Sequence, residues 1–428
     1  MTFSLPPART SGPPVDSLAY AMAAGARVVA GVLAGRSLAE GLPGWINRSA
    51  RPAVQDLVYG TLRQFGRGDF ILDELLSRPL DDADVRALLL VALYRLETRP
   101  EMAHTVVDQA VNAAGGLAAG KMRGLTNGVL RNFLRRSEAL LAAADRHEVA
   151  AHRHPEWWVR RLRESYPEQW PAIVAAGNQP PPMALRVNRK RSSVEDYGVL
   201  LAEEGIGCRS GGDDALLLER PVPVDRLPRF AEGWVSIQDP GAQRAAALLD
   251  PRPGSRVLDA CAAPGGKTAH LLERADLDLL ALDLKPARCR RIEATLERLG
   301  LAAQVRVADC ARPDAWWDGN PFDAILADVP CSASGVVRRH PDAKWLRRDA
   351  DVAGFAAAQG RILEALWRLL KPGGKLLYAT CSVFPEENQG QLTAFLARHA
   401  SARRGHEEQW LPSDDHDGFY YCLLDKLA

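Results

Sequence analysis

The sequence has few of the patterns that mark metal, disulfide or membrane proteins. Its seven cysteines are scattered, with no Cys-x-x-Cys pair and no histidine cluster beside them, which argues against a zinc site and against a disulfide framework. No uncharged apolar run reaches the length of a membrane span, and the first residues lack a charged-then-apolar signal. The chain is therefore expected to be cytoplasmic and reduced, with no metal and no membrane partner.

The chain also lacks an overall charge of one sign, since 54 Lys plus Arg balance 53 Asp plus Glu. Net charge thus gives no indication of a nucleic-acid partner. With 428 residues, of which 47% are hydrophobic, the chain is long enough for more than one domain with a real core.

The first part of the chain has a helical pattern. Apolar residues recur at spacings of three and four from about residue 16 to 145, and the segments are separated by Pro79, Pro100 and the pair Gly115-Gly116. The pattern predicts an all-α domain over residues 16–145.

A helical linker and a small mixed segment are expected over residues 150–238. The helical pattern continues to about Ala176, and the prolines at 180–182 end it. Strand-like runs at 183–187, 215–218 and 234–237, with a helix at 194–204, then predict a small α+β module.

Residues 239–428 alternate apolar strands with amphipathic helices. Strands are expected at 256–259, 278–283, 304–307, 323–328 and 375–379, and helices from 267 and at 286–299, 355–370 and 388–399. This alternation predicts a Rossmann-like α/β domain with a doubly wound, mostly parallel sheet. Residues 418–424 are expected to form a late edge strand.

A glycine turn follows the first of these strands, in the segment Asp259-Ala-Cys-Ala-Ala-Pro-Gly-Gly-Lys-Thr268. It is not a Walker phosphate loop, because Cys261 stands where that motif needs glycine, and the dinucleotide G-x-G-x-x-G spacing is absent too. An acid at the strand end and two glycines opening a helix suit a nucleoside cofactor with an amino-acid tail, such as S-adenosylmethionine. The alternative is a plain structural turn.

Further acids and two thiols stand at successive strand ends. Asp283 and Asp309 follow the second and third strands, Asp328-Val-Pro-Cys331 ends the fourth, and Cys381 follows the fifth. Alone, each Asp could be a helix cap and each Cys an apolar filler. Together at one sheet edge they indicate a shared site, in which a thiol of reference pKa about 8.5 needs a polarising neighbour to react.

These motifs resemble the Sun/Fmu (RsmB) family of bacterial 16S ribosomal RNA cytosine-5 methyltransferases, within the wider group of RNA cytosine-5 methyltransferases. The likeness covers nearly the whole chain. It rests on the glycine turn, Asp328-Val-Pro-Cys331, Ala379-Thr-Cys-Ser382, Leu57-Val-Tyr-Gly-Thr-Leu-Arg63, Leu125-Thr-Asn-Gly-Val-Leu-Arg-Asn132, Arg186-Val-Asn188 and Val235-Ser-Ile-Gln-Asp239.

The resemblance implies a NusB-like helical domain and S-adenosylmethionine-dependent methylation of carbon 5 of one cytosine in 16S rRNA, the family site being cytosine 967. It implies that Cys381 is the nucleophile and that Cys331 assists product release. The cofactor site would comprise Cys261, Ala262, Ala263, Pro264, Gly265, Gly266, Lys267, Asp283, Asp309 and Asp328.

The chemistry of cytosine agrees with this assignment. Carbon 5 is a poor nucleophile, so a thiolate must first add to carbon 6, and Asp328 at the edge of the ring would stabilise the adduct. Whether Cys331 is the base that removes the C5 proton stays open. The expected partner is 16S rRNA or a small-subunit assembly intermediate, and the sequence is compatible with a monomer without fixing the oligomeric state. The alternatives are methylation of tRNA or another RNA, and a non-catalytic RNA-binding or antitermination factor.

Two segments combine basic and aromatic residues. Residues 152–191 and residues 338–348 suit phosphate contact and base stacking. For the first segment the alternative is packing of solvated helix faces around aromatic residues. For the second, which directly follows the Pro-Cys motif, RNA contact is the favoured interpretation.

Overall fold

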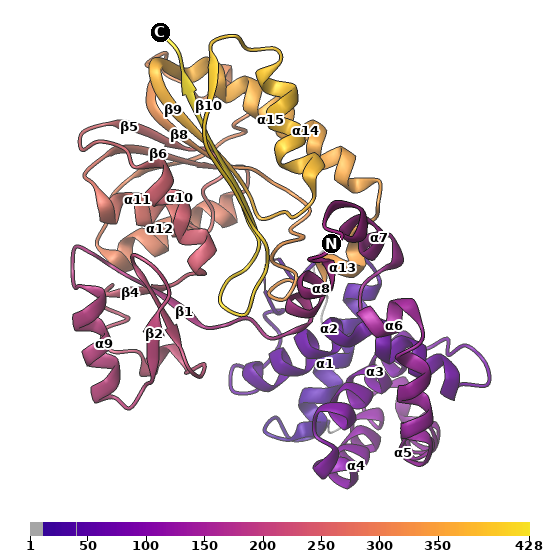
Figure 1. Cartoon of the computed structure of the whole chain (residues 1–428). Coiled ribbons are helices and arrows are strands. Elements are labelled where there is room, and N and C mark those ends of the chain that lie inside the picture. Colours follow the sequence, from indigo (N-terminus) through magenta and orange to yellow (C-terminus); the bar gives the residue numbers. More distant parts are fainter. Residues whose placement is uncertain (1–11, 40) are drawn as a thin grey trace. The chain divides into compact units, whose positions relative to one another are not determined.

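The computed structural model describes residues 12–39 and 41–428 (Figure 1). The chain divides into two compact units. The first, helical unit contains the described residues up to Pro180 together with Val337–Asp349, and the second contains Pro181–Val336 and Ala350–Ala428.

The helical unit confirms the all-α prediction for the first part of the chain. Its helices are α1 (Leu18–Leu33), α2 (Arg51–Leu75), α3 (Ala83–Thr98), α4 (Ala103–Ala114), α5 (Arg123–Ala144), α6 (Glu148–His152), α7 (Glu156–Ser165), α8 (Trp170–Asn178) and α13 (Ala343–Leu346), with short 3-10 turns η1 (Pro100–Met102) and η2 (Ala118–Gly120). Side-chain caps start α1 and α3: the Ser17 hydroxyl accepts from the Tyr20 N–H at 3.1 Å, and Asp82 accepts from the Val85 N–H at 2.9 Å.

Helix α3 is the centre of this unit. Its middle, Ala87 to Leu93, is apolar on every side and fully buried. A helical segment without a polar face must be surrounded, and α1, α2 and α4 pack against α3. The buried apolar residues of these helices form one continuous core.

The segment Val337–Asp349 belongs to the helical unit, and two of the residues expected to bind RNA, Lys344 and Trp345, make contacts inside it. Lys344 is fully buried and donates to the carbonyl oxygens of Arg63 and Arg153 and to Oδ1 of Asn178, at 2.9–3.2 Å. The indole N–H of Trp345 donates to the Leu62 carbonyl at 2.8 Å. The prediction was wrong for Lys344 and Trp345, because sequence position alone does not tell a buried cation from an exposed one.

The basic and aromatic residues of 152–191 are also engaged in contacts within the protein. Trp158 is buried, Arg161 forms an ion pair with Asp349, and the Arg163 guanidinium lies 4.4 Å from the centroid of the Trp170 ring. For these residues the structure favours the packing interpretation.

The second unit begins with the predicted α+β module. Four antiparallel strands form a sheet in the order β2-β3-β1-β4, and one helix packs on it. The elements are β1 (Ala184–Val187), α9 (Val194–Glu203), β2 (Cys208–Ser210), β3 (Ala215–Leu218), the turn η3 (Val224–Arg226) and β4 (Val235–Ile237).

The rest of the second unit is the predicted α/β domain. Its seven-stranded sheet has the order β10-β11-β9-β8-β5-β6-β7, in which β5 to β9 are parallel and β10 and β11 antiparallel. The elements are α10 (Pro240–Leu249), β5 (Arg256–Asp259), α11 (Gly266–Arg274), β6 (Asp278–Asp283), α12 (Pro286–Leu299), β7 (Gln304–Val307), η4 (Pro313–Ala315), β8 (Phe322–Asp328), α14 (Asp351–Leu369), β9 (Leu370–Thr380), η5 (Pro385–Glu387), α15 (Gln389–Leu396), β10 (Ala402–Trp410) and β11 (Phe419–Lys426).

Helices cover both faces of this sheet. Figure 1 shows α10, α11 and α12 on one face and α14 and α15 on the other. Successive residues of the central strands face opposite sides, so Leu258 and Ile325 enter one core and Val257 and Leu326 the other. None of the helices in the described part of the chain is long and apolar enough to cross a membrane.

One strand assignment from the sequence was wrong. Residues 418–424 were expected at the edge of the sheet, but β11 lies between β9 and β10, and β10 is the edge. The apolar pattern of the sequence does not predict β10, because this strand carries charged residues and is at most half-buried along its whole length. Edge strands often have these properties.

Candidate active site

The carboxyl ends of the parallel strands bring the predicted site residues to one edge of the sheet. Asp259 ends β5, Asp283 ends β6 and Asp328 ends β8. Asp328 is opposite Ala379 in the register of β8 and β9, so the loops that carry Cys331 and Cys381 leave the sheet side by side. This edge is where ligands bind in open α/β sheets.

A cavity of about 340 Å³ opens at this edge. Seven of the predicted residues line it: Cys261, Ala263, Asp283, Asp309, Asp328, Cys331 and Cys381. The lining also includes residues that the sequence analysis did not name for the site: Ala260, Leu284, Lys285, Arg288, Ala308, Cys310, Val329, Pro330 and Ile362. The other predicted residues, Ala262, Pro264, Gly265, Gly266 and Lys267, belong to the glycine turn but do not line the cavity.

The glycine turn has the backbone shape that its sequence demands. Gly265 has φ +99°, a conformation that side chains disfavour, and a Cβ there would lie 3.1 Å from the Cα of Ile292. The turn leads directly into α11, whose first residue is Gly266. Arg288 holds the turn from α12 by donating to the Ala263 carbonyl at 3.1 Å.

Asp259 is a buried carboxyl with unused hydrogen-bonding capacity. Its Oδ2 accepts from the Thr268 hydroxyl at 2.7 Å, whereas Oδ1 has no hydrogen-bond partner among the described residues. Burial raises the pKa of Asp259 to about 7. Asp259 does not itself line the cavity, but it directly precedes Ala260 and Cys261, which do.

Lys267 and Asp328 form an ion pair beside the thiols. The ammonium donates to Oδ2 of Asp328 at 2.7 Å, and the Asp328 side chain is 29% exposed. Burial lowers the pKa of Lys267, but the Asp328 carboxylate outweighs this effect and the pKa is raised overall. The site therefore keeps a positive charge at neutral pH.

The two predicted catalytic thiols are in contact. Sγ of Cys331 lies 3.3 Å from Sγ of Cys381. Cys331 is buried, while Cys381 is half-buried. The hydrogen bond with Cys381, together with burial, raises the pKa of Cys331 well above its usual value. Cys331 therefore keeps its proton and can donate it to the sulfur of Cys381.

Glu387 connects the two thiol loops, and the sequence analysis missed it. Its carboxylate is fully buried and accepts from the N–H and hydroxyl of Ser332 and from the hydroxyl of Ser382. Ser332 follows Cys331 and Ser382 follows Cys381, so one carboxylate holds both loops. The only signal is an acidic residue shortly after the Thr-Cys-Ser motif, and burial of that residue cannot be read from the sequence.

No metal centre is present in the part of the chain that the structure describes. Nowhere in residues 12–39 and 41–428 do three or more His, Cys, Asp or Glu side chains form a group that could hold a metal ion.

Family models match three parts of the chain. Residues 246–425 match the model described as 16S rRNA methyltransferase RsmB/F, residues 154–225 match the ferredoxin-like domain of RsmF/B-like methyltransferases, and residues 31–135 match the NusB family. The helical unit is thus NusB-like and the small module ferredoxin-like, and the seven-stranded domain is a Rossmann-like methyltransferase domain.

Curated relatives match over most of their length. The chain is 45% identical to ribosomal RNA small subunit methyltransferase B of Vibrio cholerae, covering 92% of this chain and 94% of the relative. It is 46% identical to the protein of the same name from Pseudomonas putida, covering 95% and 98%. A solved methyltransferase homolog from Pyrococcus horikoshii is similar with a TM-score of 0.58 and 26% identity, covering 65% of this chain and 97% of that one. The chain belongs to the RsmB/F family of 16S rRNA methyltransferases.

Proposed function

We propose that the protein methylates carbon 5 of one cytosine in 16S rRNA, at the family site cytosine 967, through a covalent adduct with Cys381. The observation that carries the proposal is the contact between two thiols, 3.3 Å apart, in a cavity that also contains Asp328. The relatives' names support 16S rRNA as the substrate.

The donor would be S-adenosylmethionine, held at the sheet edge. Asp283 and Asp309 line the cavity and offer acceptors to ribose hydroxyls and an adenine amino group, and the glycine turn contributes Cys261 and Ala263 to the lining. These groups fit a polar cofactor with a cationic end. When bound, it supplies a sulfonium methyl group that a carbon nucleophile can accept.

Cys381 would be the nucleophile. Of the two thiols it is the more exposed, and it has both a hydrogen-bond donor in Cys331 and a positive charge nearby in Lys267. Both neighbours stabilise a thiolate. Its sulfur adds to carbon 6 of the flipped-out cytosine, and the electrons of the C5–C6 double bond make carbon 5 nucleophilic.

The pair of Lys267 and Asp328 would act on the ring. One carboxylate oxygen of Asp328 already accepts from Lys267, which leaves the other to accept from the cytosine amino group. The ammonium offsets the negative charge that develops in the ring as the sulfur adds.

Release would require loss of the C5 proton. The electron pair of that C–H bond re-forms the C5–C6 double bond and expels the Cys381 thiolate. The C5 proton would pass to water acting as a base, and we propose that Cys331, the group next to that sulfur, assists by donating a proton to the departing Cys381 thiolate.

The chain would consist of three functional parts. We propose boundaries at residues 16–145 for the RNA-binding NusB-like domain, 150–238 for the linker and ferredoxin-like module, and 239–428 for the methyltransferase domain. The expected partner is 16S rRNA or an assembling small subunit in the cytoplasm.

Transfer of labelled methyl groups tests the proposal. Incubation with labelled S-adenosylmethionine and 16S rRNA should label one cytosine, and Cys381→Ala should abolish labelling while cofactor binding persists. Cys208→Ala, which changes a half-buried thiol of the ferredoxin-like module, is the matched control and should keep full activity. Full activity of Cys381→Ala would reject the proposed nucleophile. Label appearing only in tRNA would reject the proposed substrate.

A further inference from the structure

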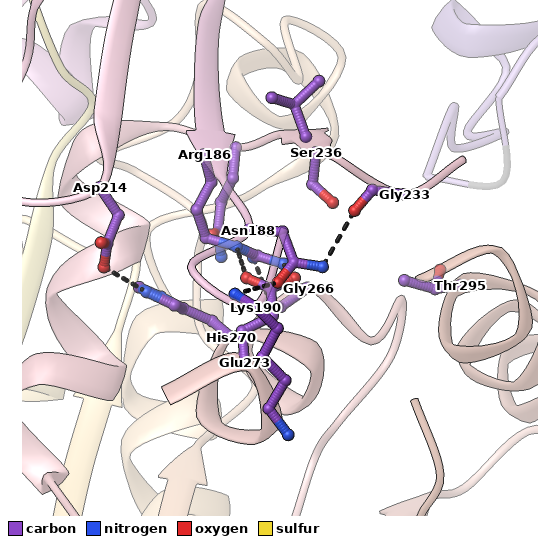
Figure 2. A network of polar contacts seen from close by, with 12 residues as sticks. Arg186, Asn188, Lys190, Asp214, Gly233, Ser236, Gly266, His270, Glu273 and Thr295 are labelled. Atoms are coloured by element: carbon purple, nitrogen blue, oxygen red, sulfur yellow. Dashed lines mark hydrogen bonds and ion pairs between the residues drawn. The ribbon is translucent and has the colours of Figure 1, made fainter. Parts of the chain in front are cut away.

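The ferredoxin-like module holds the glycine turn through a fully buried arginine. Arg186 lies in β1, the strand between β3 and β4, and its side chain is 0% exposed. It reaches across to α11, the helix that begins at the glycine turn (Figure 2). A buried guanidinium is costly unless all its donors are used, so its partners indicate its role.

The guanidinium has two kinds of partner. Nε and Nη2 form a two-pronged ion pair with Glu273 of α11, at 2.8 and 2.7 Å. Nη1 donates to the carbonyl of Gly266 at 2.6 Å and to Oε1 of Gln238. Glu273 alone would satisfy one edge of the guanidinium. The nitrogen outside that edge, Nη1, donates to the backbone of the glycine turn.

A second contact from the module holds the same helix further along. Asp214, which directly precedes β3, accepts from Nε2 of His270 at 2.9 Å (Figure 2). It also accepts from Nη1 of Arg274 at 3.1 Å. Both donors belong to α11. The hydrogen bonds to His270 and Arg189 outweigh burial and lower the pKa of Asp214 to about 2, so this carboxylate stays charged. The ferredoxin-like module therefore forms hydrogen bonds with α11 both in its first turn and near its end.

We propose that Arg186 is a positioning residue for the cofactor site: it fixes the Gly266 backbone, and with it the glycine turn, so that the ferredoxin-like module is a structural part of S-adenosylmethionine binding. This inference rests on the proposed function. Two glycines give the turn the freedom to approach a ligand, and the same freedom makes it costly to order. Fixing one carbonyl before the ligand arrives lowers the cost of ordering the turn upon binding.

The test separates this role from general stability. In the double variant Arg186→Met with Glu273→Met, an apolar pair replaces the buried ion pair, an exchange that commonly leaves stability unchanged. It removes the hydrogen bond to Gly266. We expect the dissociation constant for S-adenosylmethionine, measured by calorimetry on the full chain, to rise roughly tenfold, the size of one lost charge-assisted hydrogen bond. Hydrogen exchange at residues 261–267 should become faster in the free protein.

A matched control lies at the same boundary between module and methyltransferase domain. Arg298 of α12 donates to the carbonyls of Phe230 and Val235 and to the Ser236 hydroxyl, without contact to the glycine turn. Arg298→Met should leave cofactor affinity within about twofold, since it removes comparable hydrogen bonds elsewhere. If both variants lost the same amount of cofactor affinity, the proposal would be overturned. A general loosening of the boundary between module and methyltransferase domain would then explain the weaker binding.

A second variant guards against misfolding. Arg186→Lys keeps a positive charge for Glu273 but lacks the fork that also reaches Gly266. Weaker cofactor binding with an unchanged unfolding midpoint supports the proposal, and unchanged binding in a folded protein overturns it. If the wild-type protein itself does not bind S-adenosylmethionine, the proposed function fails instead, so the two failures are distinguishable.

Discussion

Sγ of Cys331 and Sγ of Cys381 lie 3.3 Å apart, although the residues are 50 positions apart in the chain. The pairing of β8 with β9 causes this contact, because both thiols follow the carboxyl ends of neighbouring parallel strands. The contact between the thiols depends on both strands, β8 and β9, being paired. Together they place a buried thiol with a raised pKa, Cys331, against the more exposed thiol of Cys381.

The first prediction concerns release of the product. In Cys331→Ala the nucleophile remains but its neighbour is gone, so we expect a protein–RNA adduct that survives denaturant and is visible as a slower band in gel electrophoresis. The double variant with Cys381→Ala should show no such band. Normal turnover of Cys331→Ala without an adduct would remove Cys331 from the mechanism.

The second prediction concerns Glu387. In Glu387→Gln an amide group would face hydroxyl donors of Ser332 and Ser382, so one of these hydrogen bonds is lost and the thiol loops shift. A misplacement of this kind costs about 10- to 100-fold in kcat, with KM for S-adenosylmethionine little changed, because the glycine turn is not touched. Glu387→Asp should restore part of kcat.

Glu386→Gln serves as its control, since Glu386 is the exposed neighbour of Glu387. Steady-state kinetics and thermal unfolding of all three variants test whether Glu387 positions the thiol loops. A loss of kcat that merely follows a lowered unfolding temperature, with no recovery in Glu387→Asp, would contradict a positioning role.

The third prediction is a dependence of stability on pH. Asp259 has its pKa raised to about 7 by burial, so between about pH 4 and pH 7 the folded protein holds a proton that the unfolded chain has released. Stability contributed by this group therefore falls as pH rises through that window. Asp259→Asn removes the titration. The unfolding free energy of the wild type relative to the variant should fall by on the order of 3 kcal/mol between pH 4 and pH 8.

Chemical unfolding of both proteins at several pH values measures this difference. If the difference is constant across the range, Asp259 titrates near its ordinary value in the folded protein and its unpaired oxygen is solvated.

The sequence predicted the parallel domain well because strand and helix periods alternate clearly there. Asp283, Asp309, Asp328, Cys331 and Cys381 all line the cavity because parallel strands end at the same edge. Helix α10 was missed although Asp239-Pro-Gly is a good helix start, in which Asp239 accepts from the Gly241 N–H at 2.8 Å. The same Pro-Gly pair is also typical of a boundary between domains, so the sequence alone does not decide between the two.

Burial of charged side chains could not be predicted from the sequence. Arg186, Lys344 and Glu387 look like ordinary surface residues, yet all three are buried. Each has partners far away in the sequence: Arg186 pairs with Glu273, Lys344 donates to Asn178, and Glu387 accepts from Ser332. Long-range pairing decides such positions, and local pattern does not encode it.

The fourth prediction decides between the two interpretations of Lys344. If this residue contacted RNA, Lys344→Met would weaken RNA binding and leave stability unchanged. In the structure, burial lowers its pKa well below the usual value, and its three hydrogen bonds satisfy two backbone carbonyls and the Asn178 side chain. Removing the ammonium leaves those acceptors unpaired in the interior, which costs about 3 kcal/mol or more.

We therefore expect Lys344→Met to lower the unfolding midpoint of the helical unit. At low temperature, the RNA affinity of the folded fraction of the variant should differ from that of the wild type by less than twofold. Lys121→Met, at an exposed lysine of the same unit, controls for loss of one positive charge and should leave the midpoint unchanged. Denaturant unfolding and filter binding with 16S rRNA measure the two quantities. Weakened RNA binding at an unchanged midpoint would restore the RNA-contact interpretation, because a lysine that faces solvent carries little of the folding free energy.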